Sequence, residues 1–562
     1  MAEQFIDVVN LRGRRAVNRY ERVSIGDVLE RMTWAQPDKL AIIGWPGAYA
    51  DQRFASLTYR QADEAANQVA NALAARGFSP GDRVMLVCEN SIEGYLAKLG
   101  IAKAGMVAMP LNPNLAADVV EHLIGIAEPR GAIVDAECWP RFSAVLTRTG
   151  LPLLATIAIG GDVVAGSVSF SEFIAGAATT EPDVEIHGDD IWQLLFTSGT
   201  TAMPKGVMLS HHSSHYAAMG FALSLTRGLR LECDLVSATF LPILYHVGDT
   251  PFTYSVFLSG GTLVIGRGVD PVQIAACLAT HRVTALWGGS PQLVTALSNH
   301  LDATNPDVSS LKVLVYGWGA IPPATLASLE RHAGEGFTLT GIFGQTETIA
   351  CHRFWPAKWP EVYQRTAPAL NYVGIPSPIL ASDVVDVDGT SVLGKPGMPG
   401  EAVYRGPTVA SGYYLNPEAS DEAFRDGWFH SGDSCMVDED DLRIMVDRFK
   451  DIVKSGGENV SSIRVEAVLY GHPAVARVAV IGLPHDRWGE AVTAVVVAKP
   501  DAEVSTEELI AHCRERLAGF ETPKGVAFID ALPDTVGGKV LKYKLRERFA
   551  DFYDGEASDT AG

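Results

Sequence analysis

Helix-like and strand-like segments alternate early in the chain, and this alternation constrains the fold more than any other feature. Residues 59–77 place apolar side chains at helical spacing, and the apolar run at 84–87 indicates a buried strand after a Ser-Pro-Gly-Asp turn. A second helical segment at 91–104 precedes another strand-like run at 107–111. Strand–helix–strand order predicts a parallel sheet covered by helices, and therefore an α/β fold.

The same alternation returns later in the chain. Residues 281–287 and 311–315 are strand-like, and each run lies beside a helical segment. Residues 393–449 are richer in glycine and in short β runs, such as Gly400–Tyr404 and Leu442–Met445. We therefore expect parallel-rich sheets covered by helices, followed by a small β subdomain.

The pattern changes after Lys450. A compact α+β unit is predicted there, with helices at 462–470 and 506–517 and strands at 475–481 and 491–498. A chain of 562 residues exceeds one ordinary domain. We predict a large N-terminal domain over residues 1–449 and a small, mobile C-terminal domain over residues 450–562.

Composition narrows the classes of function. A formal net charge of −21 opposes nonspecific binding to nucleic acid, which needs a cationic surface. The seven cysteines are scattered without a C-x-x-C pair, so neither a zinc site nor a disulfide framework is indicated. The first residues lack the pattern of a signal peptide, and no apolar stretch is long enough to span a bilayer. We expect a cytoplasmic protein without an integral membrane segment.

The loop at residues 196–206 is the strongest chemical signal. It is rich in threonine, serine and glycine, it contains Lys205, and apolar strands lead into and out of it. Backbone N–H groups, hydroxyls and an ammonium group together suit a polyphosphate. The loop is not a Walker A motif, because Pro204 precedes the lysine and Gly206 follows it. The alternative is a polar surface hairpin without a ligand.

Five motifs resemble those of the ATP-dependent adenylate-forming enzymes, which include acyl-CoA synthetases, nonribosomal adenylation domains and luciferases. Residues 197–206 read TSGTTAMPKG and resemble the family's phosphate loop, with Ala202 in place of glycine. The other four follow in the family's order: GIFGQTE at 341–347, GWFHSGD at 427–433, DRFKDIVKSGGEN at 447–459 and PDTVGGK at 533–539. The resemblance spans most of the chain.

The resemblance implies a reaction in two steps. A carboxylic acid reacts with ATP and Mg²⁺ to give an acyl-adenylate and pyrophosphate, and coenzyme A then takes the acyl group as a thioester with release of AMP. Two alternatives within the class are an amide synthetase, which uses an amine, and a ligase that serves a carrier protein. A nucleotide-binding scaffold without turnover is the alternative from another class. A homodimer is also possible.

The resemblance also assigns catalytic roles. Lys539 reaches the substrate carboxylate and the α-phosphate, Thr346 contacts the α-phosphate, and Glu347 helps to bind Mg²⁺. Lys450 is the hinge about which the small domain turns after adenylate formation. The β- and γ-phosphates are held by Thr197, Ser198, Gly199, Thr200, Thr201 and Lys205.

The remaining expected residues bind the nucleotide, the thiol and the acid. Phe343 stacks on adenine beside Gly344, Gly319 and Ala320; Asp433 and Arg448 hold the ribose; Gly456 and Gly457 line the pantetheine path. A turn aspartate and a structural salt bridge are the alternatives for Asp433 and Arg448. The acyl site is assigned to His246, Trp287, Gly288, Gly317 and Trp318, and the alternative for His246 is a core or gate histidine without a chemical role. Trp318 replaces the usual glycine, and its bulk favours an aryl or cyclic acid over a long fatty acid.

Overall fold

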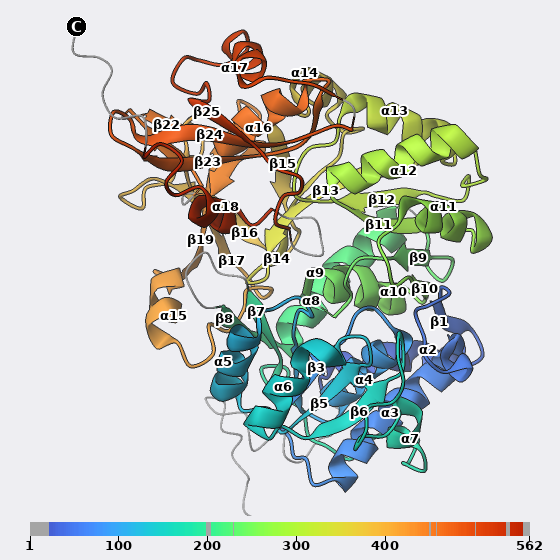
Figure 1. Ribbon diagram of the computed structural model, residues 1–562. Helices are drawn as coiled ribbons and strands as arrows, with labels where there is room; N and C mark the ends of the chain where they lie inside the picture. Colours follow the sequence, from blue (N-terminus) through green and yellow to red (C-terminus); the bar gives the residue numbers. More distant parts are fainter. Residues whose placement is uncertain are drawn as a thin grey trace, which may run out of the picture.

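The computed structural model describes residues 22–197, 204–228, 230–244, 246–448, 451–456, 458–500, 502–534 and 540–554. These residues form three β-sheets with helices around them (Figure 1). The mixed α/β fold expected from the sequence is confirmed.

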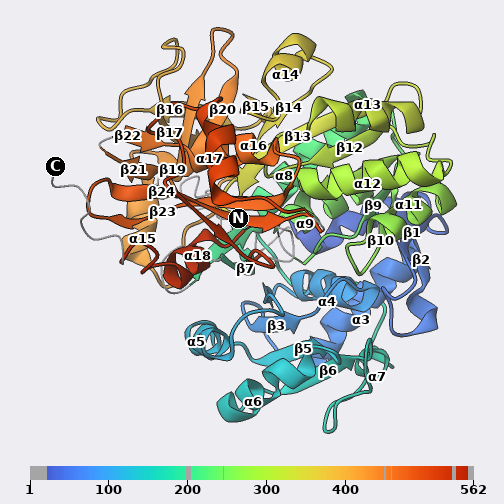
Figure 2. The same ribbon diagram turned by 45° about the horizontal axis from the view of Figure 1, so that its top comes forward.

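The first sheet has six strands in the order β6-β5-β3-β4-β7-β8, parallel except for β8, which pairs antiparallel with β7. The strands are β3 (Arg83–Val87), β4 (Val107–Pro110), β5 (Gly131–Asp135), β6 (Leu153–Ile157), β7 (Ile191–Thr197) and β8 (Lys205–Ser210). Helices α3 (Tyr59–Ala75) and α4 (Ile92–Lys103) cover one face, and α5 (Ala117–Ala127) and α6 (Trp139–Thr149) cover the other (Figure 2).

The alternation of side chains along β3 explains these two layers. Val84 and Leu86 point into the core shared with α3 and α4, whereas Met85 and Val87 point into the core under α5 and α6. Every residue of α4 is buried, so this helix is an interior element without a polar face.

The second sheet has 14 strands in the order β16-β17-β19-β20-β15-β14-β13-β12-β11-β9-β10-β1-β2, with β18 paired to β19. Its bounds are β1 (Leu40–Gly44), β2 (Ser56–Thr58), β9 (Val236–Thr239), β10 (Thr262–Ile265), β11 (Ala285–Gly289), β12 (Val313–Tyr316), β13 (Thr338–Gln345), β14 (Ile349–Phe354), β15 (Asn371–Pro376), β16 (Ala381–Val385), β17 (Gly400–Arg405), β18 (Phe424–Arg425), β19 (Trp428–Val437) and β20 (Arg443–Arg448). The small β region is thus continuous with the helix-covered part, and it starts at Asn371, earlier than expected.

Two groups of helices pack on this sheet. Helices α11 (Pro271–Thr280), α12 (Pro291–Thr304) and α13 (Pro323–His332) cover the outer face. The inner face is covered by α8 (His211–Leu223), η4 (Ser224–Gly228), α9 (His246–Asp249), η5 (Thr250–Tyr254) and α10 (Ser255–Leu258), between the two sheets in Figure 1. The remaining elements are η2 (Ile25–Leu29), α2 (Glu30–Ala35), η3 (Gln52–Phe54), α7 (Phe170–Ile174), α14 (Pro360–Thr366) and α15 (Pro417–Ala423).

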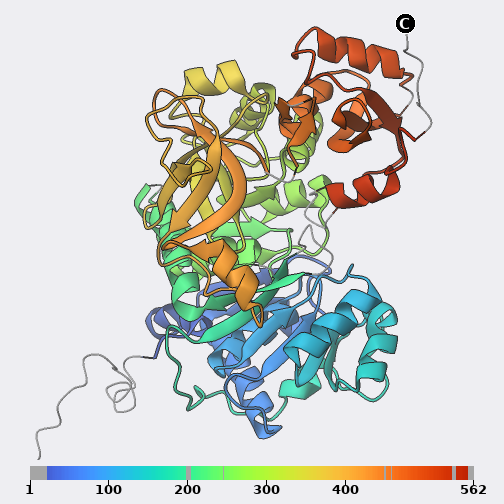
Figure 3. The same cartoon turned by 90° about the vertical axis from the view of Figure 1, so that its left-hand side faces the viewer.

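The third sheet stands apart from the rest, at the upper right of Figure 3. It contains β21 (Val453–Ser455), β22 (Glu458–Val460), β23 (Val475–His485), β24 (Gly489–Ala498) and β25 (Gly525–Phe528), with α16 (Ser462–Tyr470), α17 (Thr506–Arg514) and α18 (Lys542–Arg548) packed on it. This is the α+β unit expected after Lys450. The boundary itself, at residues 449 and 450, lies outside the described residues, so the division into two domains stays a prediction.

Two of the expected strands differ at their ends. The run at 281–287 becomes a strand only at Ala285, because α11 continues to Thr280 and Arg282 takes a left-handed turn with φ of 48°. The run at 475–481 continues to His485, because β23 pairs with β24 as a long hairpin. No helix in the described part of the chain combines the length and the apolar character needed to cross a membrane.

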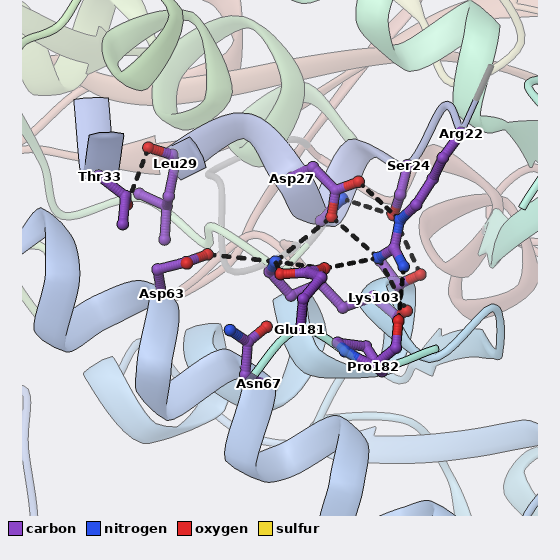
Figure 4. A network of polar contacts seen from close by, with 12 residues as sticks. Arg22, Ser24, Asp27, Leu29, Thr33, Asp63, Asn67, Lys103, Glu181 and Pro182 are labelled. Atoms are coloured by element: carbon purple, nitrogen blue, oxygen red, sulfur yellow. Dashed lines mark hydrogen bonds and ion pairs between the residues drawn. The ribbon is translucent and has the colours of Figure 1, made fainter. Parts of the chain in front are cut away.

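A buried ionic network holds the start of the described chain against α3 and α4. The ammonium group of Lys103, which is fully buried, lies 3.3 Å from Asp27, 3.1 Å from Asp63 and 2.8 Å from Glu181 (Figure 4). Arg22 bridges two of these carboxylates, at 3.0 Å from Asp27 and 2.8 Å from Glu181. Lys103 and Arg22 therefore share acidic partners, and both cations are balanced by carboxylates.

Candidate active site

The polar loop at 196–206 joins β7 and β8 as a hairpin. Thr197 pairs directly with Lys205, and the Thr197 hydroxyl donates a hydrogen bond to the Lys205 carbonyl at 3.4 Å. The expected hairpin is confirmed at both of its ends. The predicted phosphate-binding residues Ser198, Gly199, Thr200 and Thr201 lie outside the described residues.

A tyrosine connects Lys205 to Glu347. The Lys205 ammonium lies 4.9 Å from the centre of the Tyr413 ring, and the Tyr413 hydroxyl donates a 2.9 Å hydrogen bond to Oε1 of Glu347. Burial, with the nearby Glu347 carboxylate, raises the pKa of Tyr413, so its hydroxyl stays protonated and can donate. The loop lysine and the predicted metal-binding carboxylate therefore lie on the two sides of one side chain.

Backbone pairing holds Tyr413 in this place. Residues 410–414 run beside β8, where the Tyr414 N–H donates to the Gly206 carbonyl at 2.7 Å. The Ala410 N–H donates to the Glu347 carbonyl at 2.7 Å, so the same segment contacts both partners. Sequence reasoning missed Tyr413; the only local signal was a glycine followed by two tyrosines at 412–414.

The turn from β13 to β14 carries Thr346 and Glu347. Phe343 precedes this turn and is partly buried, and its ring centre is 6.3 Å from that of His352 on the neighbouring strand. Full burial beside Arg443 keeps the pKa of His352 well below its usual range, so its imidazole is neutral behind the aromatic ring. Stacking of Phe343 and Gly344 on adenine stays a prediction, as does the Thr346 contact to phosphate.

Asp433 and Arg448 face each other across β19 and β20. They are direct partners in the register, and Nε of Arg448 lies 3.1 Å from Oδ1 of Asp433. Gln345, from the end of β13, donates to the other oxygen at 3.4 Å. The ion pair that was the alternative role for Arg448 is present. The pair lies beside the strand that leads to Thr346. A role for the pair in binding the ribose stays a prediction.

Aromatic rings gather at the carboxyl ends of β11 and β12. Trp287 stacks on Phe252 with ring centres 4.2 Å apart and an interplanar angle of 6°, and Trp318 lies 5.5 Å from Trp287. Trp318 is 47% exposed and has φ of 65°, a left-handed conformation that a bulky residue rarely adopts. Such strain is typical of functional sites. Gly319 and Ala320 follow it in the loop before α13.

The two glycines of the expected acyl site point to different faces of the sheet. A side chain at Gly317 would meet Ile342 and Trp287, so this position belongs to the aromatic wall. A side chain at Gly288 would instead meet Leu314 at 2.8 Å, in the core under α12. Gly317 is therefore the better placed of the two to contact an acid.

His246 begins the short helix α9, and its side chain lies outside the described part. The end of this helix is anchored by Asp249, which forms a fully buried ion pair with Lys98 of α4. Lys98 also donates to the Leu244 carbonyl at 2.6 Å. The helix that starts at His246 is thereby fixed to the first sheet's interior helix.

In the C-terminal unit, Gly456 is the one expected site residue that the structure describes; Lys450, Gly457 and Lys539 lie outside the described residues. Gly456 has φ of 62°, and a side chain there would meet the Trp488 ring at 3.0 Å. The Trp488 ring also has two cations over it, Arg487 at 4.8 Å and Lys524 at 5.2 Å. Sequence reasoning missed this cation-flanked ring.

Two polar residues of this unit, Ser462 and Asp534, form contacts that fix them in place. Ser462 binds Asp447 through its N–H at 2.7 Å and its hydroxyl at 2.6 Å, which ties α16 to the end of β20. Asp534 forms a two-point ion pair with Arg477, so its negative charge is balanced.

A hairpin lysine linked to a carboxylate through one tyrosine, a carboxylate–arginine pair on antiparallel strands, and a cluster of aromatic rings at the carboxyl ends of β11 and β12 are features expected of the adenylate-forming class of ATP-dependent enzymes. Comparison with known families agrees. The family of AMP-binding enzymes matches residues 29–414, and the C-terminal domain of AMP-binding enzymes matches residues 464–539. The chain belongs to the AMP-binding enzyme family.

Relatives cover most of the chain. A feruloyl-CoA synthase of Amycolatopsis is 34% identical over 501 residues, which cover 88% of this chain and 94% of that protein. A long-chain-fatty-acid–CoA ligase of Mycobacterium tuberculosis is 31% identical over 498 residues, 88% of this chain and 93% of that protein. The crystal structure of ATP-bound MatB from Rhodopseudomonas palustris has a TM-score of 0.80 and 29% identity, over 94% of this chain and 99% of that one.

Proposed function

We propose that this protein is a carboxylic acid–coenzyme A ligase. An oxygen of the substrate carboxylate attacks the α-phosphorus of ATP, the bond from that phosphorus to the bridging oxygen breaks, and pyrophosphate leaves. The thiol of coenzyme A then loses its proton and attacks the acyl carbon, and AMP leaves with the electrons of the acyl–phosphate bond. Positioning and charge stabilisation do most of the work in both steps.

The observation that carries this proposal is the Lys205–Tyr413–Glu347 arrangement. Lys205 and Glu347 come from segments far apart in sequence, yet both contact one tyrosine. An ammonium group and a carboxylate with a proton donor between them suit a triphosphate and its metal ion. A polar surface hairpin without a ligand would not require a buried carboxylate behind its lysine.

The residues present fit a magnesium ion. Glu347 offers carboxylate oxygens and Thr346 a hydroxyl, and hard oxygen donors are what Mg²⁺ prefers. The Tyr413 hydroxyl fixes Oε1 of Glu347, which orients the carboxylate. When bound, Mg²⁺ would neutralise phosphate charge. We assign Lys205, Thr197 and the 198–201 loop to the phosphates, and Asp433 and Arg448 to the ribose.

The C-terminal unit supplies the remaining groups. Lys539 acts as the cation that offsets repulsion between the carboxylate and the α-phosphate. The unit then turns about Lys450, with residues 1–449 and 450–562 as the two moving parts. The Ser462 N–H donates to Asp447 across the proposed hinge, and Arg546 pairs with Asp451 just after it, both at 2.7 Å. These contacts would stabilise one orientation of the C-terminal unit.

Coenzyme A is favoured as the acceptor by the Trp488 site. The indole with Arg487 and Lys524 over it is a cationic patch in a chain of net charge −21. An aromatic ring flanked by cations suits a nucleotide with anionic phosphates. Gly456 lets the Trp488 ring pack directly against the backbone, because a side chain at this position would meet the ring at 3.0 Å. The two relatives named above, one acting on an aromatic acid and one on fatty acids, are both CoA enzymes.

An aryl or cyclic acid fits the pocket better than a long chain. The buried rings of Trp287 and Phe252 stack on each other, and the exposed Trp318 ring lies against Trp287, so flat aromatic surfaces line this region. We further infer a cytoplasmic location, which is supported by the free thiols of all six cysteines that the structure describes. A homodimer stays a prediction.

Acid-dependent exchange of labelled pyrophosphate into ATP tests the first step. We expect exchange by the full-length protein with Mg²⁺, and at least a tenfold loss in Tyr413→Phe, which keeps the ring under Lys205 but releases Glu347. Tyr59→Phe is the matched control, because its buried hydroxyl donates to the Gly261 carbonyl away from the site. Adding coenzyme A should convert exchange into net release of AMP with a thioester product.

Two results would contradict the proposal. Exchange that no acid supports would leave only a nucleotide-binding protein. Exchange without formation of a thioester would show that coenzyme A is not the acceptor. An amide product on addition of amines would then identify an amide synthetase, and an acylated carrier protein would identify a carrier-protein ligase.

A further inference from the structure

Arg353 is a buried guanidinium on β14 that has few partners. It is 4% exposed, and its centre lies 4.3 Å from the middle of the Phe221 ring. One terminal nitrogen donates to the Ser224 hydroxyl, and the other donates to the Gly220 carbonyl at 3.2 Å. Nε is buried without a hydrogen-bond partner.

These contacts leave most of the guanidinium unsatisfied. An arginine carries five N–H donors, and the contacts above use two of them. Within the described part of the chain, no carboxylate forms an ion pair with Arg353. Burial lowers its pKa to about 10, and no acidic group raises it, so the side chain remains charged at neutral pH. The carbonyl of Gly220 and the Phe221 ring offset only part of the charge.

Strand register places Arg353 on the face of the sheet that lines the aromatic pocket. Trp287 pairs with Val315, Val315 pairs with Thr340, and Ile342, two residues beyond Thr340, pairs with Arg353. Residues that pair across a sheet, and residues two apart on one strand, point to the same face. Arg353 therefore extends the wall formed by Trp287 and Val315.

A small cavity next to this sheet face reaches the same arginine through one shared residue, Phe221. A small cavity of about 20 Å³ lies between this sheet face and the inner helices, and Phe221, Leu225, Phe252, Trp287 and Val315 are among its lining residues. Phe221 lines the cavity and also stacks on Arg353. Ser224 and Phe252 belong to the π-helical segments η4 and η5, a local geometry that is frequent at functional sites.

We propose that Arg353 binds a second carboxylate of the substrate, so that the enzyme activates dicarboxylic acids, one carboxylate reacting with ATP while the other pairs with the guanidinium. This proposal rests on the ligase function proposed above. Arg353 is already out of water, so an entering carboxylate gains charge-assisted, two-point hydrogen bonds without a further cost of dehydrating the cation. A neutral acceptor would leave the buried charge unbalanced.

The position of Arg353 along the strand direction limits how long a dicarboxylic substrate can be. Its partner Ile342 follows Gly341, which pairs with Tyr316 at the carboxyl end of β12. The arginine therefore lies near the level at which β12 ends and the segment with Gly317 and Trp318 begins, not at the far end of the strands. A short or flat dicarboxylic acid fits this spacing better than a long one.

Matched pairs of acids test the proposal. We would measure acid-dependent pyrophosphate exchange for one linear and one aromatic dicarboxylic acid. Each diacid would be compared with two neutral analogues: its monomethyl ester, and the acid that carries a methyl group in place of the second carboxylate. For the preferred pair, the wild-type protein should give at least a tenfold higher kcat/KM for the diacid, mainly through KM. Arg353→Met should bring that ratio below two, and Arg353→Lys should keep an intermediate ratio.

Control variants and a second measurement keep the outcome decisive. Arg443→Met removes another buried arginine, which contacts Ser382 and the Asp383 carbonyl, and should keep the diacid preference. If Arg353→Met does not fold, protection of the wild-type protein against heat by the diacid but not by its ester is the measurement that decides. Exchange that favours the neutral analogue in every pair would overturn the proposal and leave the ligase function intact. Exchange with no acid at all would overturn both.

Discussion

Two buried cations, Lys103 and Arg353, lie in opposite electrostatic surroundings. Lys103 of α4 is surrounded by Asp27, Asp63 and Glu181, all within 3.3 Å (Figure 4). Arg353 of β14 contacts a hydroxyl, a carbonyl and an aromatic ring, with no carboxylate beside it among the described residues. The first cation is satisfied by the fold, whereas the second has binding capacity left over.

The difference between Lys103 and Arg353 distinguishes a buried charge that stabilises the fold from one that is available to bind a ligand. A buried ion pair that is complete is costly to break, because removing one partner leaves the other charge unbalanced. Lys98, paired with Asp249, belongs with Lys103 in this respect. A buried cation without an anion is unusual unless a ligand supplies one. Three predictions test whether the two sites differ as the contacts indicate.

Lys103→Met should have the largest effect. It leaves three carboxylates close together without their shared cation, so we expect a loss of about 3–5 kcal/mol in the free energy of unfolding. The midpoint of urea unfolding, followed by tryptophan fluorescence, measures this. Lys395→Met, at an exposed position, should change stability by less than about 0.5 kcal/mol. A loss below about 1 kcal/mol for Lys103→Met would show that the network is not what holds this region.

Glu30→Gln should have a smaller, pH-dependent effect. Burial, with Asp27 nearby, raises the pKa of Glu30 from 4.5 to about 7. The folded state therefore holds this proton more tightly than the unfolded state, and the wild-type protein loses stability as the pH rises from about 4.5 to about 7. Glutamine does not titrate, so the variant should melt a few degrees higher than the wild type at pH 8 and at nearly the same temperature at pH 5.

Glu121→Gln provides the control of opposite sign. The Arg148 guanidinium beside Glu121 lowers the pKa of this exposed carboxyl, so its contribution to stability is present at higher pH and lost as the pH falls. Its variant should therefore not gain stability at pH 8. Equal shifts for both variants at pH 8 would show that the raised pKa of Glu30 does not lower the stability of the wild-type protein.

Arg353→Met should have the smallest effect on stability. The substitution removes a charge that has no acidic partner and strands no carboxylate, so we expect a change within about 1 kcal/mol in either direction, without ligand. The same urea experiment measures it beside Lys103→Met. A loss as large as that of Lys103→Met would mean that Arg353 is held by contacts of the fold alone, which would break the comparison.

Much of the fold and part of the site could be predicted from the sequence. Helices α3, α4 and α16, strands β3 and β4, and the hairpin around residues 198–203 follow from periodicity and turn residues, which act over a few neighbouring positions. Lys205 and Glu347 were found because each stands in a short motif. The extent of the second sheet was not found, because pairing of β14 with β15 joins regions that have separate local patterns.

The residues that sequence reasoning missed share a physical cause. Tyr413 matters because its segment pairs with β8, and Trp488 because it packs on Gly456. Arg353 matters because register carries it onto the same face as Trp287. None of these relations has a signature within the few residues on either side.

The sequence by itself determined the class of fold, the order of its elements and the phosphate-loop chemistry, because spacing and residue type are local properties of the chain. Only the tertiary structure decided which side chains meet. Whether a buried cation finds a carboxylate, as Lys103 does, or a ring, a hydroxyl and a carbonyl, as Arg353 does, depends on segments brought together from distant parts of the chain.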